Sequence, residues 1–266
     1  MSGGRLNGQG ILVTRPAHHA DKLVSAIERQ GGSAIRFAAI EIRPRDAAAI
    51  RRDLDSLLPA DIVIFVSSTA VAHGFRPEFV GAGQVAAIGP TTQAEIVEAG
   101  GTVDIVPVTG FDSEHLLLEP ALQDVAGRCV RIIRGNGGRE LLADTLRARG
   151  ARVEYLAVYE RRPEHYSEPQ LRELTDRWQT GQITRVVIMS VETLTNLLEI
   201  LPPAGLELLR KTPLVTPSKR VIQKASELLP GVPTTLSAGP QTGDMIRALS
   251  SDPDQRLRKN GPEVPR

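Results

Sequence analysis

The feature that most constrains this chain is an internal duplication. Residues 11–44 align without gaps on residues 130–163, at an offset of 119 positions. Seven of the 34 positions are identical, and they fall on a turn, the end of an expected helix and the exit of an expected strand. The identical pairs are Arg15 and Arg134, Leu23 and Leu142, Gly31 and Gly150, Ala38 and Ala157, Glu41 and Glu160, Arg43 and Arg162, and Pro44 and Pro163. The alignment predicts two similar units.

Each unit has the pattern of an α/β fold. Apolar runs of strand length alternate with segments whose apolar residues have helical spacing. Runs such as "DIVIFVS", "QVAAIG", "GTVDIVP" and "RCVRIIR" are rich in Val and Ile and are bounded by polar residues or glycine. Such runs are typical of strands buried on both faces, so we expect parallel sheets flanked by helices.

The order of the repeated segments predicts one continuous and one discontinuous domain. The set at 183–250 lacks an opening strand of its own and can use the strand–helix–strand segment at the N-terminus. We therefore predict a domain at 45–158 and a second domain made of 1–39 and 164–251. Residues 40–44 and 159–163 would cross between the two domains and pair as a two-stranded ladder. The tail at 252–266 has almost no apolar residues, so disorder is expected there.

Composition excludes several classes of function. A net charge of +1 gives no reason to expect non-specific binding to nucleic acid or to a membrane. The single cysteine, Cys129, cannot form an intramolecular disulfide or a cysteine-cluster metal site. The N-terminus does not resemble a signal peptide, and no apolar run approaches the roughly 20 residues of a membrane span. We expect a cytoplasmic protein without a metal or a cofactor.

Polar turns follow most of the expected strands, where parallel sheets usually bind ligands. These turns contain Ser67, Ser68, Thr92, Ser190 and Ser218, each at the expected start of a helix. Free backbone N–H groups and the helix dipole favour anions at such positions. The alternative is that these side chains only cap their helices. Together with the turns that contain Arg15 and Arg134, this makes six polar turns, and six turns around one cleft would favour a ligand with several negative charges.

The stretch "RIIRGNGGRE" resembles a phosphate-binding turn, with Arg134, Gly135, Asn136, Gly137 and Arg139 at its centre. Its glycines do not fit a dinucleotide motif, because an acidic residue occupies the place of the third glycine. This argues against a nucleotide-dependent enzyme.

Arginine suits carboxylates better, because its planar guanidinium binds them through two parallel hydrogen bonds. Arg15, Arg134, Arg139 and Arg220 all lie in turns after expected strands, although each could also be an ordinary surface residue.

One of the three tyrosines, Tyr159, lies in the second crossing strand, where the first copy has Ile40. A tyrosine that replaces an aliphatic residue there could donate a proton or a hydrogen bond to a ligand. The alternative role is packing between the crossing strands.

Taken in order, the motifs resemble the uroporphyrinogen-III synthase family across residues 9–250. They are "ILVTRP", "FVSSTAV", "AAIGPTT", "FDSEHLL", "IRGNGGRELLADTLRARGARVEYLAVYER", "MSVETLTNLL" and "LVTPSKRVIQKA". The resemblance implies two flavodoxin-like domains joined by a two-stranded ladder. It also implies a lyase that cyclises hydroxymethylbilane, a linear tetrapyrrole, with loss of water and inversion of ring D, to give uroporphyrinogen III in haem biosynthesis.

The resemblance also implies roles for individual residues. The family's active-site tyrosine matches Tyr159, which would assist loss of the substrate hydroxyl. The threonine of the family's "G-x-x-T" turn matches Thr92, and the family's serine after the third strand matches Ser67 and Ser190. The turn "TPSKR" departs from the family's usual glycine and threonine, which puts Ser218 and Arg220 in doubt.

Given this resemblance, the protein is expected to be a monomer that makes transient contact with hydroxymethylbilane synthase. We expect it to bind no cofactor and to interact with neither nucleic acid nor membrane.

The sequence leaves one alternative to the synthase function. A non-catalytic two-domain binding protein or sensor for a polycarboxylate could present the same turns.

Overall fold

The computed structural model describes residues 4–138 and 140–251. The tail at 252–266, for which disorder was expected, lies outside the described residues, as does Arg139. The chain divides into two compact units: unit 1 comprises Met1–Glu41 with Arg162–Arg266, and unit 2 comprises Ile42–Arg161. These limits differ by a few residues from the ranges expected from the duplication. That each unit is an independent domain stays a prediction.

Unit 1 contains a five-stranded parallel sheet with the strand order β10-β9-β8-β1-β2. Counted along the chain, this is the order 2-1-3-4-5 of flavodoxin-like sheets. The strands are β1 (Gly10–Val13), β2 (Ser33–Arg36), β8 (Arg185–Val187), β9 (Leu214–Thr216) and β10 (Thr234–Leu236). The helices are α1 (Ala17–Arg29), α8 (Glu168–Gln179), α9 (Val191–Ile200), α10 (Pro203–Leu209), α11 (Lys219–Leu228) and α12 (Thr242–Leu249).

Both faces of this sheet are covered by helices. Ile11 and Val13 of β1 pack with α1 and α12, whereas Leu12 points to the opposite face and packs with residues of α8, α9 and α11. In α1 the buried residues Leu23, Val24 and Ile27 have the spacing of one helical face. A strand with buried residues on both faces is what the continuous apolar runs predicted.

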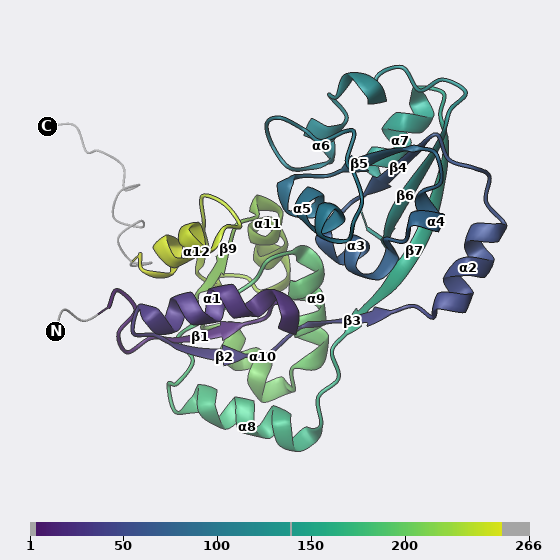
Figure 1. The fold of residues 1–266 in the computed structure, drawn as a ribbon. Coiled ribbons are helices and arrows are strands. Elements are labelled where there is room, and N and C mark those ends of the chain that lie inside the picture. Colours follow the sequence, from purple (N-terminus) through teal and green to yellow (C-terminus); the bar gives the residue numbers. More distant parts are fainter. Residues whose placement is uncertain (1–3, 139, 252–266) are drawn as a thin grey trace, which may run out of the picture. The chain divides into compact units, whose positions relative to one another are not determined.

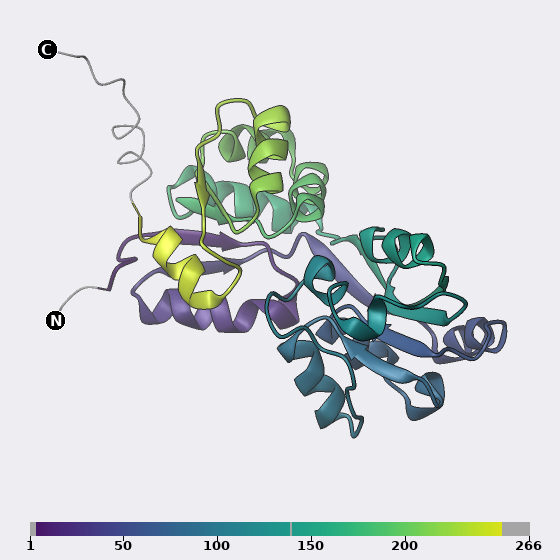
Figure 2. The same ribbon diagram turned by 90° about the horizontal axis from the view of Figure 1, so that it is seen from above.

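Unit 2 contains a second five-stranded sheet with the order β3-β7-β6-β4-β5. Its strands are β3 (Ile40–Pro44), β4 (Ile62–Phe65), β5 (Gln84–Ala87), β6 (Cys129–Gly135) and β7 (Arg152–Pro163). Its helices are α2 (Ala47–Asp55), α3 (Ser68–Gly74), α4 (Pro77–Val80), α5 (Pro90–Glu98), α6 (Ser113–Leu116), the 3₁₀ turn η1 (Pro120–Leu122) and α7 (Leu141–Ala148). Figures 1 and 2 show helices on both faces of this sheet as well.

Strand registers support the duplication residue by residue. Leu12 is paired with Ile35 in unit 1, and the residues 119 positions later, Arg131 and Glu154, are paired in unit 2. Ile11 is also paired with Arg185 of β8, and its counterpart Val130 with Ile62 of β4. Four strands correspond in the two sheets: β1 to β6, β2 to β7, β8 to β4 and β9 to β5. The fifth strand differs, because unit 1 has β10 beside β9 whereas unit 2 has β3 beside β7. Since β6 and β7 come last in unit 2 whereas β1 and β2 come first in the chain, the shared strands have a permuted chain order.

The segments expected to form a ladder lie within a larger sheet. β3 is the hydrogen-bonded neighbour of β7 at the edge of the unit 2 sheet, and β7 is a single strand of 12 residues. Just beyond β3, the Arg45 N–H donates to the Val158 carbonyl at 3.1 Å. The pairing of 40–44 with 159–163 is therefore a continuation of the sheet rather than a separate element.

One expected strand, "GTVDIVP" at 101–107, does not form. Only a single bridge joins Ile105 to Ala86. Asp104 accepts a hydrogen bond from the Val85 N–H through its side chain at 2.7 Å. The side chain therefore takes a donor that a regular strand would bind with its backbone, and Pro107 has no N–H to continue a ladder.

Candidate active site

A cavity of about 180 Å³ lies in unit 2, and several predicted site residues line it. The carboxyl ends of parallel strands meet at one edge of a sheet, here called the carboxyl edge. Ser67, Arg134, Gly135, Gly137 and Tyr159 all belong to this edge and border the cavity. The remaining lining residues are Val66, Ser113, Ile132, Gly138, Leu142, Tyr155 and Arg161.

Tyr159 is almost completely buried, with 4% of its surface exposed. Its ring packs in the core of unit 2 and lies 5.9 Å from the ring of His73. The strand register shifts between Arg134 and Gly135, so that Gly135 pairs with Tyr159. A β-carbon at Gly135 would lie 2.4 Å from the tyrosine ring, so only glycine leaves room for it. Both the packing role and the hydrogen-bonding role considered for Tyr159 remain compatible with this position.

The turn after β6 is anchored to β7 next to Tyr159. The Asn136 N–H donates to the Tyr159 carbonyl at 3.0 Å, and the Asn136 side chain accepts from the Arg161 N–H at 2.5 Å. Gly137 has φ of +67°, a backbone conformation that favours glycine. Asn136 thus orients the turn and is not among the residues that line this cavity. Its expected role in binding the substrate stays a prediction.

Arg134 is held inside this turn with only 9% of its side chain exposed. Its Nε donates to the Gly137 carbonyl at 3.0 Å, and one terminal nitrogen donates to Glu140 at 3.1 Å. The guanidinium also lies 4.7 Å from the centre of the Tyr155 ring. The alternative of an ordinary surface arginine therefore does not apply to Arg134.

Glu140 and Tyr155 were not among the predicted site residues. The Tyr155 hydroxyl donates to Glu140, and this hydrogen bond, together with Arg134, lowers the pKa of the Glu140 carboxyl. Burial and the nearby Glu140 carboxylate raise the pKa of Tyr155. Tyr155 lies four residues before Tyr159, but the register shift lies between them, and the two rings pack with different core clusters. Strand alternation therefore does not point to Tyr155.

The serines and threonines take up the predicted positions at helix starts. Ser67 caps α3 by accepting from the Ala70 N–H at 3.0 Å, and Ser190 caps α9 by accepting from the Thr193 N–H at 3.1 Å. Ser68 is the first residue of α3, and Thr92 is buried in the first turn of α5. The cap is thus real for Ser67 and Ser190, and Ser67 also borders the cavity.

The remaining predicted residues belong to unit 1. Arg15 follows β1, and burial lowers the pKa of its guanidinium. Ser218 is the N-cap residue of α11 but forms no side-chain cap, and its backbone N–H donates to the Thr216 hydroxyl oxygen at 3.2 Å. Arg220 is exposed in the first turn of α11. In the described residues, the cavity lined by Tyr159 includes none of these three.

Metal clusters and membrane-spanning helices are both absent from the part of the chain that the structure describes. Within 4–138 and 140–251, no three residues among His, Cys, Asp and Glu gather as a metal site would require. In the same part of the chain, no helix combines the length and apolar character needed to cross a bilayer.

Comparison with known proteins identifies the family. The family model "Uroporphyrinogen-III synthase HemD" matches residues 21–247. The uroporphyrinogen-III synthase of Escherichia coli is 36% identical over 199 residues, which cover 72% of this chain and 80% of that protein. That of Salmonella typhimurium is also 36% identical, over 227 residues that cover 82% of this chain and 91% of that protein.

Solved structures are similar in fold. Uroporphyrinogen III synthase from Thermus thermophilus matches with a TM-score of 0.58 at 17% identity, covering 95% of this chain and all of that chain. The enzyme from Helicobacter pylori matches with a TM-score of 0.60 at 12% identity, covering 90% of this chain and 97% of that chain. On the strength of the family model and the two enterobacterial relatives, this chain belongs to the uroporphyrinogen-III synthase family.

Proposed function

We propose that this protein is a uroporphyrinogen-III synthase, a lyase of haem biosynthesis. It cyclises hydroxymethylbilane with loss of water and inversion of ring D. The observation that carries the proposal, beside family membership, is the cavity at the carboxyl edge of unit 2. There a buried tyrosine and a buried arginine lie beside a helix start and a glycine-rich turn.

Tyr159 is the proposed catalytic residue. Loss of the hydroxymethyl hydroxyl as water requires a proton, and a phenol that borders the cavity is suited to hydrogen-bond that leaving group. Loss of water leaves a cationic azafulvene. Ring D attacks it through its substituted carbon to give a spiro intermediate, which fragments and recloses with ring D reversed.

Selectivity depends on how the substrate is held. Uncatalysed closure gives the uninverted isomer I, so the protein must fix one conformation of a flexible chain that carries several carboxylates. Arg134, the backbone N–H groups of the turn after β6 and the start of α3 at Ser67 and Ser68 are proposed to bind carboxylates in unit 2. Thr92 is proposed to contribute from α5.

The turns of unit 1 are proposed to bind carboxylates in the same manner. Arg15 follows β1, Ser190 begins α9, and Ser218 with Arg220 begins α11. Asn136 and Gly137 hold the turn that carries Arg134. Arg139 is proposed from the sequence alone, since it lies outside the described residues.

The finer architecture and the partners are proposed on the same grounds. The strand order of unit 1 and the repeated register support two flavodoxin-like domains, at 1–39 with 164–251 and at 45–158. The pairing of β3 with β7 supports a two-stranded connection between them. The proposed protein is a cytoplasmic monomer that needs no cofactor and receives its unstable substrate through transient contact with hydroxymethylbilane synthase.

The test is an isomer assay. The purified protein is mixed with freshly made hydroxymethylbilane, and isomers I and III of the product are separated by chromatography. Isomer III is expected to predominate. In the same assay Tyr159→Phe is expected to form isomer III more slowly. Its matched control is Tyr166→Phe, because Tyr166 lies in unit 1 and donates to the Ala38 carbonyl at 3.0 Å. Formation of isomer I alone by the unmodified protein would reject the proposed function.

A further inference from the structure

The starting point is an unused hydrogen-bond donor on Arg134. Its second terminal nitrogen is buried and has no hydrogen-bond partner among the described residues. A buried donor on a charged group that lacks a partner is costly, because it has lost its hydrogen bonds to water without replacement. Both Arg134 and the turn that covers this nitrogen border the cavity with Tyr159. The N–H groups of this second terminal nitrogen are therefore left for an additional acceptor.

Glu140 binds only one of the two terminal nitrogens of Arg134. Its carboxylate approaches one terminal nitrogen at 3.1 Å and leaves the other unused, whereas arginine binds a carboxylate best through both. Half of the Glu140 side chain is exposed, so it can turn into water. Water around the exposed Glu140 carboxylate screens its attraction to Arg134. An incoming carboxylate that uses both nitrogens is thus a stronger partner for Arg134 than Glu140 is.

The first copy of the duplication has the same positions with a different pairing. The counterparts of Arg134, Glu140 and Tyr155, at the offset of 119, are Arg15, Asp21 and Arg36. Asp21 forms an ion pair with Arg36 at 2.7 Å. No hydrogen bond or ion pair of the Arg15 side chain is found within the described part of the chain.

The partner of the acidic side chain thus differs between the copies together with the residue at the position of Arg36. With an arginine there, as in unit 1, the acid is held away from the arginine of the turn. With Tyr155 there, as in unit 2, the acid pairs with both the tyrosine and Arg134.

We infer that Glu140 is an internal substitute for a substrate carboxylate, which displaces it from Arg134 when the substrate binds. This inference rests on the proposed function, because it assigns Arg134 to one carboxylate arm of the linear tetrapyrrole. The cavity of about 180 Å³ suits such an arm rather than the whole ligand, since pockets for drug-sized ligands measure about 300–1,000 Å³. Tyr155 donates to whichever carboxylate is present. Glu140 is a positioning residue that lowers affinity for carboxylates until it is displaced.

The test uses propionate as a probe of Arg134 and needs no activity. In arginine side-chain ¹⁵N–¹H spectra, the Nε–Hε signal of Arg134 is assigned from its loss in Arg134→Gln. Propionate is titrated against chloride at equal ionic strength, and the Arg134 signal is expected to shift saturably with propionate only. In Glu140→Gln the half-saturating concentration is expected to fall about two- to fivefold, as loss of a weak competing ion pair requires.

Two further variants sharpen the test. Tyr155→Arg copies the arrangement of unit 1 and is expected to lower the half-saturating concentration as Glu140→Gln does. Glu98→Gln removes an exposed carboxylate from α5 and is the matched control, with no expected change. An Arg134 signal that does not respond to propionate overturns the inference, as does a half-saturating concentration that is unchanged or higher in Glu140→Gln.

The isomer assay on the same preparations separates the two claims. The KM for hydroxymethylbilane is expected to fall in Glu140→Gln and to rise in Arg134→Gln. The effect of Glu140→Gln is expected to vanish in the Arg134→Gln background, because the two residues then no longer compete. If isomer III forms but propionate does not shift Arg134, the inference alone fails. If propionate binds as described but no isomer III forms, the proposed function alone fails.

Discussion

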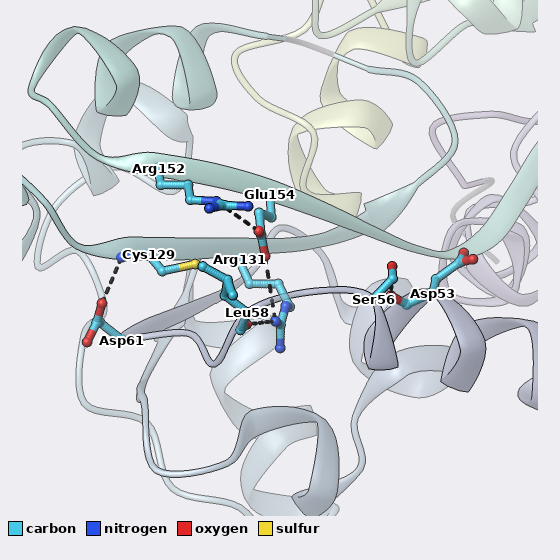
Figure 3. A network of polar contacts seen from close by, with 8 residues as sticks. All are labelled: Asp53, Ser56, Leu58, Asp61, Cys129, Arg131, Arg152 and Glu154. Carbon is cyan, nitrogen blue, oxygen red and sulfur yellow. Dashed lines mark hydrogen bonds and ion pairs between the residues drawn. The ribbon is translucent and has the colours of Figure 1, made fainter.

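The pair formed by Arg131 and Glu154 offers a quantitative test of the duplication, away from the site. The two side chains are 5% and 9% exposed, and their closest nitrogen and oxygen are 3.7 Å apart (Figure 3). Arg131 also donates to the Leu58 carbonyl, and Glu154 accepts from Arg152 at 3.1 Å. The corresponding pair in unit 1 is Leu12 and Ile35, which have the same register and are equally buried.

Glu154→Gln would leave the Arg131 charge buried without its carboxylate. Two charges about 4 Å apart attract each other by about 4 kcal/mol at an effective dielectric constant of 20. Breaking a buried pair from one side usually costs about 3–5 kcal/mol. Because Arg131 keeps the Leu58 carbonyl, we expect the free energy of unfolding of unit 2 to fall by about 3 kcal/mol. Arg152→Gln removes an exposed partner and is expected to cost at most about 1 kcal/mol.

Replacing both residues by those of the first copy should have a different result. Arg131→Leu with Glu154→Ile recreates the apolar pair of unit 1 in an identical register. Exchanging a buried ion pair for apolar residues is often neutral or stabilising by about 1–4 kcal/mol. The double variant is therefore expected to be at least as stable as the original protein.

The assay is urea unfolding followed by circular dichroism, together with hydrogen exchange of β6 and β8. Exchange of β6 reports on unit 2, and exchange of β8 serves as the internal reference in unit 1. The reasoning is refuted if Glu154→Gln costs no more than Arg152→Gln. It is also refuted if the double variant is less stable than Glu154→Gln alone, since the two copies would then not be interchangeable at these positions.

Other variants test the site and the core. Tyr159→Phe is expected to slow isomer III formation about a hundredfold while product affinity changes less; unchanged turnover would remove Tyr159 from the mechanism. Gly135→Ala is expected to displace the Tyr159 ring and to destabilise the protein by about 1–3 kcal/mol, measured by urea unfolding. Ser67→Ala removes a helix cap and is expected to cost about 1 kcal/mol in the same assay. Burial raises the pKa of Tyr166 to about 12, so stability should fall as pH rises from about 10 to about 12, and Tyr166→Phe should reduce that fall; equal slopes would contradict it.

The general architecture could be predicted from the sequence because it depends on where apolar residues lie along the chain. Continuous Val and Ile runs predicted strands buried on both faces, and β1, β4 and β6 are buried along their whole length. The prediction of a strand at 101–107 was wrong, because the Asp104 side chain accepts a hydrogen bond from the Val85 N–H, which competes with strand pairing there. The spacing of apolar residues cannot reveal such competition, because the competition depends on a single polar side chain.

The candidate site was predictable only in part. Glycine and serine turns after strands indicated the carboxyl edge, and Ser67, Arg134 and Tyr159 do lie together there. The Glu140–Tyr155 contact was not predicted, because it depends on how a particular turn folds back over β7. The turn itself is fixed by the register shift at Gly135, which has no distinct sequence pattern.

The two copies differ in side chains at positions where their strand register is the same. Positions 12 and 35 carry an apolar pair in one copy and an ion pair in the other, at 131 and 154, with no change in strand register. The register therefore does not depend on the identity of those side chains. At the turn, the acidic side chain likewise has different partners, Arg36 in one copy and Tyr155 in the other. Differences of this kind are expected to make the two copies unequal in carboxylate binding, with the arginine of unit 2 regulated by its own glutamate.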